Sequence, residues 1–126
     1  MRILLIDDDV GLCQMTQKVL LKNGYTVDVF HDAASGLAQA KSSRPDLILV
    51  DIMLPDISGP EMVDSLKKEA EFKDMPVIFL TALVTGNEDA LEAKGIMVGG
   101  LRYQILGKPY AIEKLLAIIK SYQTGG

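Results

Sequence analysis

The sequence contains a single cysteine, Cys13, so it cannot form an internal disulfide. It has no apolar run near the ~20 residues that a membrane-spanning helix needs. With 13 Lys and Arg against 17 Asp and Glu, it lacks the basic excess with which proteins bind nucleic acid. The first expected strand starts at Arg2, so we expect no signal peptide before it. We therefore expect a cytoplasmic protein that contacts neither membranes nor nucleic acid directly.

What the sequence does have is a regular alternation of strand-like and helix-like segments. Short runs of branched apolar residues predict strands buried on both faces, and apolar residues at helical spacing predict helices between them. The expected strands cover 3–6, 25–30, 45–51, 77–80 and 104–106, and the expected helices cover 12–23, 32–43, 58–70, 85–91 and 110–122. This alternation is typical of an α/β doubly wound parallel sheet with helices on both faces. The length of 126 residues fits one domain.

Chemically useful side chains gather where the expected strands end. Asp7 and Asp8 follow the first strand, Asp51 ends the third, Thr81 follows the fourth and Lys108 follows the fifth. Right-handed crossovers bring the carboxyl ends of parallel strands to one edge of the sheet, where such sheets keep their sites. Carboxylates brought close together either share protons or bind a cation, and Mg²⁺ prefers oxygen ligands. Acids, a metal ion, a lysine and a hydroxyl are the parts of a phosphoryl-transfer site, in which an aspartate can be the nucleophile.

A resemblance to a known family rests on four segments, namely ILLIDDD at 3–9, LILVDIMLPDISG at 47–59, PVIFLTA at 76–82 and KPY at 108–110. In order and spacing, they resemble the receiver domain of bacterial two-component response regulators. The resemblance implies a flavodoxin-like fold of five parallel strands in the order 2-1-3-4-5. It makes residues 1–123 the receiver domain and 124–126 a tail or the start of a linker.

The resemblance also implies a function and partners. A receiver accepts a phosphoryl group from a histidine kinase or a phosphotransfer protein, and then changes the surface that it offers to an output domain or protein. It catalyses its own phosphorylation but does not turn over an external substrate. The sequence names neither the kinase nor the output partner.

Individual site residues can be carried over from the family by position. Asp51 matches the phosphorylated aspartate, which is also a metal ligand. Asp8 matches a direct ligand of Mg²⁺, and Asp7 matches an acid that acts through metal-bound water. The Met53 position offers its main-chain carbonyl to the metal, so its side chain need not be polar.

Two further matches concern activation, and other reactive residues are expected to be structural. Thr81 matches the hydroxyl that moves to the phosphoryl group, and Lys108 matches the lysine that pairs with a phosphoryl oxygen. Asp9 is expected to cap the first helix, because aspartate is a preferred N-cap residue. His31 is expected to be a solvated residue at a strand end, and Cys13 a small core residue on a helix.

The chain departs from the family pattern at several places. Ile105 stands where the family often has Tyr or Phe as a rotamer switch, although Tyr103 would share its face in a regular strand. The stretch that contains 94–102 is about eight residues longer than the resemblance leads us to expect. It either remodels a partner-binding surface or forms a simple surface loop. Met53 and Leu83 are apolar at positions that tune phosphate lifetime, and neither side chain can orient an attacking water by hydrogen bonding, so we expect slow self-dephosphorylation.

Two other functions are alternatives to the signalling switch. Asp7 and Asp9 are spaced like the acids of haloacid-dehalogenase-like Mg²⁺ phosphatases, but Gly11 and the short chain argue against such an enzyme. A phosphate-independent interaction module with the same fold is the other alternative. The complete set of acids, hydroxyl and lysine at the strand ends argues against it.

Overall fold

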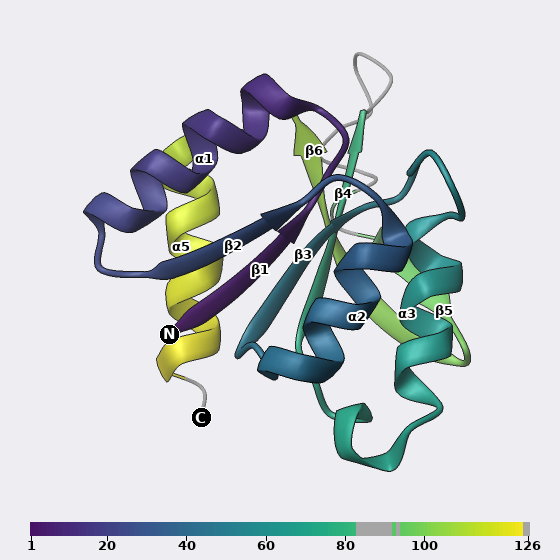
Figure 1. Cartoon of the computed structure of the whole chain (residues 1–126). Coiled ribbons are helices and arrows are strands. Elements are labelled where there is room, and N and C mark those ends of the chain that lie inside the picture. The colour runs from purple at the N-terminus through teal and green to yellow at the C-terminus, as the bar shows by residue number, and fades with distance from the viewer. Residues whose placement is uncertain (83–91, 93, 125–126) are drawn as a thin grey trace.

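The computed structural model describes residues 1–82, 92 and 94–124, and within them the chain forms a six-stranded sheet covered by helices (Figure 1). The strands are β1 (Arg2–Ile6), β2 (Thr26–Phe30), β3 (Leu47–Asp51), β4 (Val77–Ala82), β5 (Ile96–Val98) and β6 (Leu101–Lys108). The helices are α1 (Val10–Lys22), α2 (Ala33–Ser43), α3 (Gly59–Lys67), the 3₁₀ turn η1 (Ala70–Phe72) and α5 (Ile112–Thr124). None of the helices in the described ranges is long and apolar enough to cross a membrane.

The strand order is β2-β1-β3-β4-β6-β5, and every neighbouring pair except β6 and β5 is parallel. The parallel strands therefore have the order expected from the sequence, and the α/β doubly wound fold is confirmed. In this register Ile6 lies opposite Val50, and Asp51 lies opposite Leu80. The ends of β1, β3 and β4 consequently meet at one edge of the sheet.

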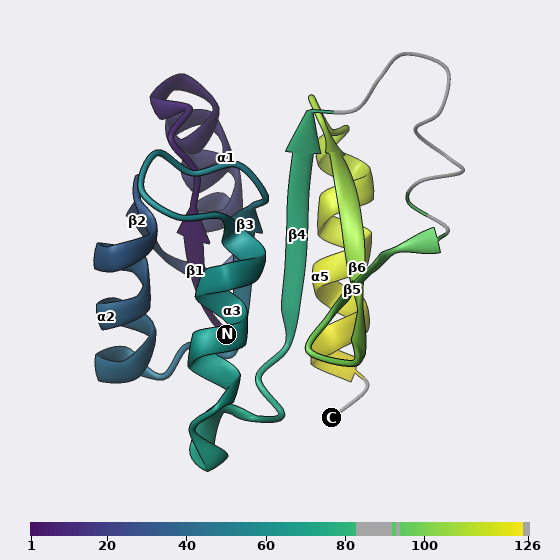
Figure 2. The same cartoon turned by 90° about the vertical axis from the view of Figure 1, so that its right-hand side faces the viewer.

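The two faces of the sheet are covered by different helices. Figures 1 and 2 show α1 and α5 on one face, and α2 and α3 on the other. Because side chains alternate along a strand, Ile3 and Leu5 of β1 pack toward one face, and Leu4 and Ile6 pack toward the other. These β1 side chains are completely buried, which explains why the predicted strand is an uninterrupted apolar run rather than an alternating one.

The far edge of the sheet differs from the prediction of five strands. Most of the stretch expected to be longer than in the family forms a hairpin, in which β5 pairs antiparallel with the first three residues of β6. Gly99 and Gly100 make the two-residue turn with φ of 56° and 82°, because a turn of this kind needs positive φ at both central positions. The last strand therefore begins at Leu101 rather than at residue 104.

Several helix ends are set by side chains that satisfy free main-chain N–H groups. Asp9 accepts a hydrogen bond from Leu12 N at 3.1 Å at the start of α1, which confirms the expected cap. Ser58 accepts from Glu61 N at 3.2 Å at the start of α3. Helix α3 ends at Lys67, three residues earlier than predicted, and η1 follows it. The helix expected over 85–91 lies outside the described residues.

Candidate functional site

The carboxylates of Asp7 and Asp51 lie side by side where β1 and β3 end. Asp7 directly follows β1, Asp51 is the last residue of β3, and the two strands are neighbours in parallel register. Their residues are only 1% and 4% exposed, whereas Asp8, the next residue along, is exposed. Two acids buried this deeply need a compensating charge, because a buried carboxylate is costly when it is unpaired.

Lys108 supplies that charge from the end of β6. Its Nζ lies 2.6 Å from Asp51 Oδ2, and 3.0 Å and 3.2 Å from the two carboxylate oxygens of Asp7. The lysine side chain is 13% exposed, so the ion pairs are shielded from solvent. The structure thus brings together three residues that are 101 and 57 positions apart in sequence.

Asp7 and Lys108 each shift the pKa of the other. Burial raises the pKa of Asp7, and the hydrogen bonds from Asp9 N–H and Lys108 oppose that rise only in part. Burial by itself would lower the pKa of Lys108, but its hydrogen bonds and attraction to Asp51 and Asp7 outweigh this and raise it. Lys108 is therefore a fixed positive charge at neutral pH.

Main-chain groups hold the two carboxylates in place. Asp9 N–H donates to Asp7 Oδ1 at 3.0 Å, and Met53 N–H donates to Asp51 Oδ1 at 3.1 Å. The Met53 side chain is 75% exposed, so its backbone rather than its side chain faces the site. One oxygen of each acid therefore accepts from a main-chain amide, while Lys108 donates to both oxygens of Asp7 and to the other oxygen of Asp51.

The main-chain carbonyl of Asp7 is also fixed, by two residues whose role the sequence analysis did not foresee. His31 Nδ1 lies 2.8 Å from it and must carry the proton, because a carbonyl only accepts. The Cys13 thiol donates to the same oxygen at 3.4 Å. Burial, followed by the nearby acids, raises the pKa of Cys13 to about 12, so the residue stays a thiol. Cys13 is a buried helix residue as predicted, but it also supports the site.

The acids could hold a divalent cation. One oxygen from each of Asp7, Asp8 and Asp51 lies within 4.8 Å of the others. A set made only of carboxylate oxygens suits a hard cation such as Mg²⁺, whereas softer metals prefer nitrogen and sulfur. Asp8 is exposed at the rim and makes the cluster accessible from solvent. The donor set therefore fits Mg²⁺.

Thr81 lies at the same edge, close to the end of β4. It is half-buried and stands opposite Gly107 in the register of β4 and β6, while Ala82 stands opposite Lys108. Its position is one strand away from Asp51, outside the ion-pair cluster of Lys108, Asp7 and Asp51. Leu83 lies outside the described residues.

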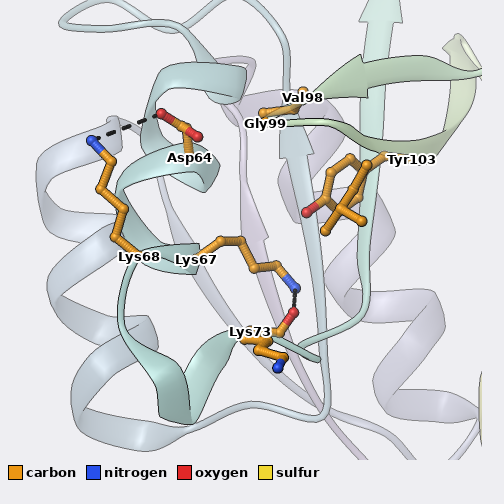
Figure 3. A pocket seen from close by; sticks show the side chains of 8 residues that line it. Asp64, Lys67, Lys68, Lys73, Val98, Gly99 and Tyr103 are labelled. Carbon is orange, nitrogen blue, oxygen red and sulfur yellow. Dashed lines mark hydrogen bonds and ion pairs between the residues drawn. The ribbon is translucent and has the colours of Figure 1, made fainter.

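Tyr103 is an aromatic residue two positions before Ile105, which stands at the position of the family's rotamer switch. Tyr103 and Ile105 are both buried on the same face of β6, as expected for a regular strand. The Tyr103 ring packs edge-on against Phe79 at 5.5 Å. Figure 3 shows it beside a pocket of about 160 Å³ between α3 and the hairpin, where Lys67 Nζ donates to Lys73 O at 3.1 Å and lies 5.8 Å from the Tyr103 ring.

Asp56 links the loop after β3 to α2, a contact that no sequence pattern signalled. Its carboxylate oxygens accept hydrogen bonds from Ala33 N at 2.8 Å and Ala34 N at 2.9 Å. These bonds lower the pKa of Asp56, because they favour the charged form. The loop that follows Asp51 is therefore anchored to the positive end of a neighbouring helix.

The chain is similar in sequence to known proteins. The chain is 35% identical over 120 residues to the response regulator MprA of Mycobacterium ulcerans (strain Agy99), covering 95% of this chain and 49% of that protein. It is 35% identical over 121 residues to MprA of Mycobacterium avium (strain 104), covering 96% and 50%. The chain thus spans about half the length of these curated relatives.

The chain also resembles solved structures. The chemotaxis protein CheY4 of Vibrio cholerae matches with a TM-score of 0.79 at 26% identity, over 96% of this chain and 97% of that one. A CheY-like receiver domain protein from Methanospirillum hungatei JF-1 matches with a TM-score of 0.78 at 27% identity, over 99% and 98%. The family model of the response regulator receiver domain matches residues 3–120. The chain therefore belongs to the response regulator receiver domains of two-component signalling.

Proposed function

We propose that this receiver is a phosphorylation-dependent switch that accepts a phosphoryl group on Asp51 in the cytoplasm. The donor is the phosphohistidine of a histidine kinase or a phosphotransfer protein, and residues 1–123 form the functional unit. The observation that carries the proposal is the position of Lys108 Nζ, 2.6 Å from Asp51 Oδ2 and 3.0 Å from Asp7 Oδ2. An acid that is buried, held by an amide and paired with a lysine is poised to receive an anionic group.

The chain's own residues account for most of the chemistry. A carboxylate oxygen of Asp51 forms a bond to phosphorus while the bond from phosphorus to the donor's imidazole nitrogen breaks, and the electron pair leaves with that nitrogen. The Met53 N–H orients the nucleophile, and Lys108 offers its ammonium to a phosphoryl oxygen. Thr81, at the end of the adjacent strand, would donate its hydroxyl to a second phosphoryl oxygen.

Asp7, Asp8, Asp51 and the Met53 carbonyl are the groups that we propose to hold Mg²⁺. When bound, Mg²⁺ supplies positive charge that offsets the negative charge of the acids and the phosphoryl group. Asp7 contributes a buried carboxylate, and Asp8 contributes an exposed one that a cation can reach from solvent.

The phosphorylated protein should persist, because the residue beside the acceptor offers no polar side chain to an attacking water. Met53 is exposed next to Asp51 and apolar. The chain is then a self-phosphorylating acceptor rather than an enzyme with an external substrate. Rapid decay of the phosphorylated protein, unchanged in Met53→Asn, would contradict this part of the proposal.

The decisive experiment is labelling by a small phosphodonor. Wild-type protein incubated with phosphoramidate and Mg²⁺ should gain one acid-labile phosphoryl group, measured by intact-protein mass spectrometry. Asp51→Asn should not be labelled, and Asp64→Asn, which removes one charge from the surface of α3, should be labelled like wild type. Labelling of Asp51→Asn that survives acid would refute the assignment of Asp51.

A further inference from the structure

Gly107 N–H is a buried donor on the open side of β6. Strand β5 pairs with β6 only from Leu101 to Tyr103, so the antiparallel ladder ends before Gly107. The amide instead donates its hydrogen bond to a side chain, because Glu92 Oε2 accepts from Gly107 N–H at 2.8 Å. A buried N–H of this kind would cost free energy if it had no acceptor.

Glu92 is itself held on its other oxygen. Its Oε1 pairs with Lys114 Nζ of α5, and the Glu92 side chain is only 14% exposed. Burial tends to raise the pKa of Glu92, but the bonds to Lys114 and to Gly107 N–H outweigh it and lower the pKa. The carboxylate is therefore charged at neutral pH and fixed between a strand and a helix.

The amide that Glu92 holds belongs to the residue directly before Lys108. On its other side, the same stretch of β6 lies against β4, with Thr81 opposite Gly107 and Ala82 opposite Lys108. The backbone from which the Lys108 side chain departs is therefore held from both sides. Only the Glu92 side depends on a single side chain.

We propose that Glu92 is a positioning residue of the phosphoryl-acceptor site, which fixes the origin of the Lys108 side chain through its hydrogen bond to Gly107. The proposal rests on the proposed function, because it assigns Lys108 to the transferred group. Small displacements of a group that contacts the transition state are costly, and ~1 Å can reduce a rate by up to ~100-fold. Because Glu92 acts one residue away from Lys108, we expect a loss of about fivefold to tenfold in the rate of labelling when the bond is removed.

The test separates the hydrogen bond from the charge. Glu92→Gln keeps an oxygen that can accept from Gly107 N–H but loses the charge that pairs with Lys114. Glu92→Asp keeps the charge but withdraws the carboxylate by roughly 1.5 Å, out of hydrogen-bond reach. The proposal therefore expects labelling by phosphoramidate within about twofold of wild type for Glu92→Gln, and about fivefold to tenfold slower for Glu92→Asp.

Lys114→Ala is the matched control, since it removes the partner on α5 and leaves the bond from Gly107 to Glu92. It should be labelled at the wild-type rate even if its thermal midpoint falls. The thermal midpoint of every variant is measured beside the labelling rate, because a merely structural role would make the rates follow the midpoints.

The results divide cleanly. A wild-type rate in Glu92→Asp, a slower rate in Glu92→Gln than in Glu92→Asp, or rates that follow the midpoints would overturn the role of Glu92. Failure of wild type itself to be labelled would instead refute the proposed function.

Discussion

Replacing Lys108 with methionine is the sharpest test of how the acidic cluster is balanced. The substitution keeps much of the side-chain volume and removes the ammonium charge that lies between Asp7 and Asp51. Both acids remain almost completely buried, at 1% and 4% exposure. In the absence of Mg²⁺ they would then face each other without the ammonium.

The magnitude follows from the distances and the burial. At 2.6 Å, one ion pair is worth about 6 kcal/mol at an effective dielectric of ~20, before the cost of burying the lysine is subtracted. Removing one partner of a buried pair leaves a net loss of roughly 3–5 kcal/mol. We expect about 3 kcal/mol here, because Asp8 leaves the cluster open to solvent on one side. For 126 residues, this corresponds to a fall of about 10 °C in the thermal midpoint.

The loss should depend on pH with a definite sign. Burial already raises the pKa of Asp7, and loss of the Lys108 ammonium would raise it further. Such a carboxyl has a higher pKa in the folded state than in the unfolded state. Its contribution to the free energy of unfolding is fully present below the unfolded pKa and is lost as the pH rises through the folded pKa. The difference between wild type and Lys108→Met should therefore be largest at neutral pH and shrink as the pH falls toward the ordinary value of 3.8.

Urea unfolding followed by circular dichroism, in EDTA at pH 7 and pH 5, measures this difference. Lys41→Met is the matched control, because its ion pair with Glu69 is 2.7 Å long but more than 40% exposed on both sides. It should change the free energy of unfolding by less than about 1 kcal/mol at either pH. If Lys108→Met were as stable as the control at pH 7, or if its deficit grew at pH 5, the reasoning would be wrong.

Further predictions concern packing, the cation and a helix cap. Gly59→Ala should lower the free energy of unfolding by about 1–3 kcal/mol in urea titrations, because its Cβ would lie 2.2 Å from the main-chain oxygen of Asp51. In Gly11→Ala, inside α1, the added Cβ would lie 3.8 Å from Asp9 Oδ1. This substitution should leave the free energy of unfolding unchanged or raise it by up to ~1 kcal/mol. Mg²⁺ at about ten times its Kd should raise the thermal midpoint of wild type by about 5 °C, and an equal rise in Asp8→Asn would contradict the proposed ligand set. Asp56→Asn should lower the thermal midpoint at pH 7. Since the folded pKa of Asp56 is lowered, its contribution is present above the ordinary value of 3.8 and is lost as the pH falls through the folded pKa. A difference between Asp56→Asn and wild type that persisted below that pH would argue against this cap.

The parallel core could be predicted because its physical signal is local. Runs such as Leu47 to Val50 are buried on both faces. A short uninterrupted run of branched apolar residues is typical of a buried parallel strand. The hairpin of β5 and β6 also has a local signal in the sequence, which the prediction of five strands did not include. Ile96 to Val98 and Leu101 to Tyr103 flank two glycines, a spacing that favours a two-residue turn.

The meeting of the acids and the lysine at one site could be predicted from the topology of the sheet. The hydrogen bonds that hold the surrounding backbone in place could not. Once the strands are parallel, the residues that follow them must meet at one edge. The bonds of Asp56 to α2 and of Glu92 to Gly107 instead join segments through the tertiary fold, 23 and 15 residues apart. Neither bond has a fixed sequence spacing or a characteristic neighbour, so a pattern in one sequence cannot reveal it.

The hairpin has a consequence for how the molecule behaves at high concentration. Strand β5 is the outermost strand on its side of the sheet, and it is only three residues long. Gly95 and Gly99 bound it with φ of 70° and 56°, so the backbone turns away at both ends before a neighbouring molecule could extend the ladder. An edge strand this short, with Lys94 before it and Arg102 after it in the sequence, is a poor template for self-association of sheets.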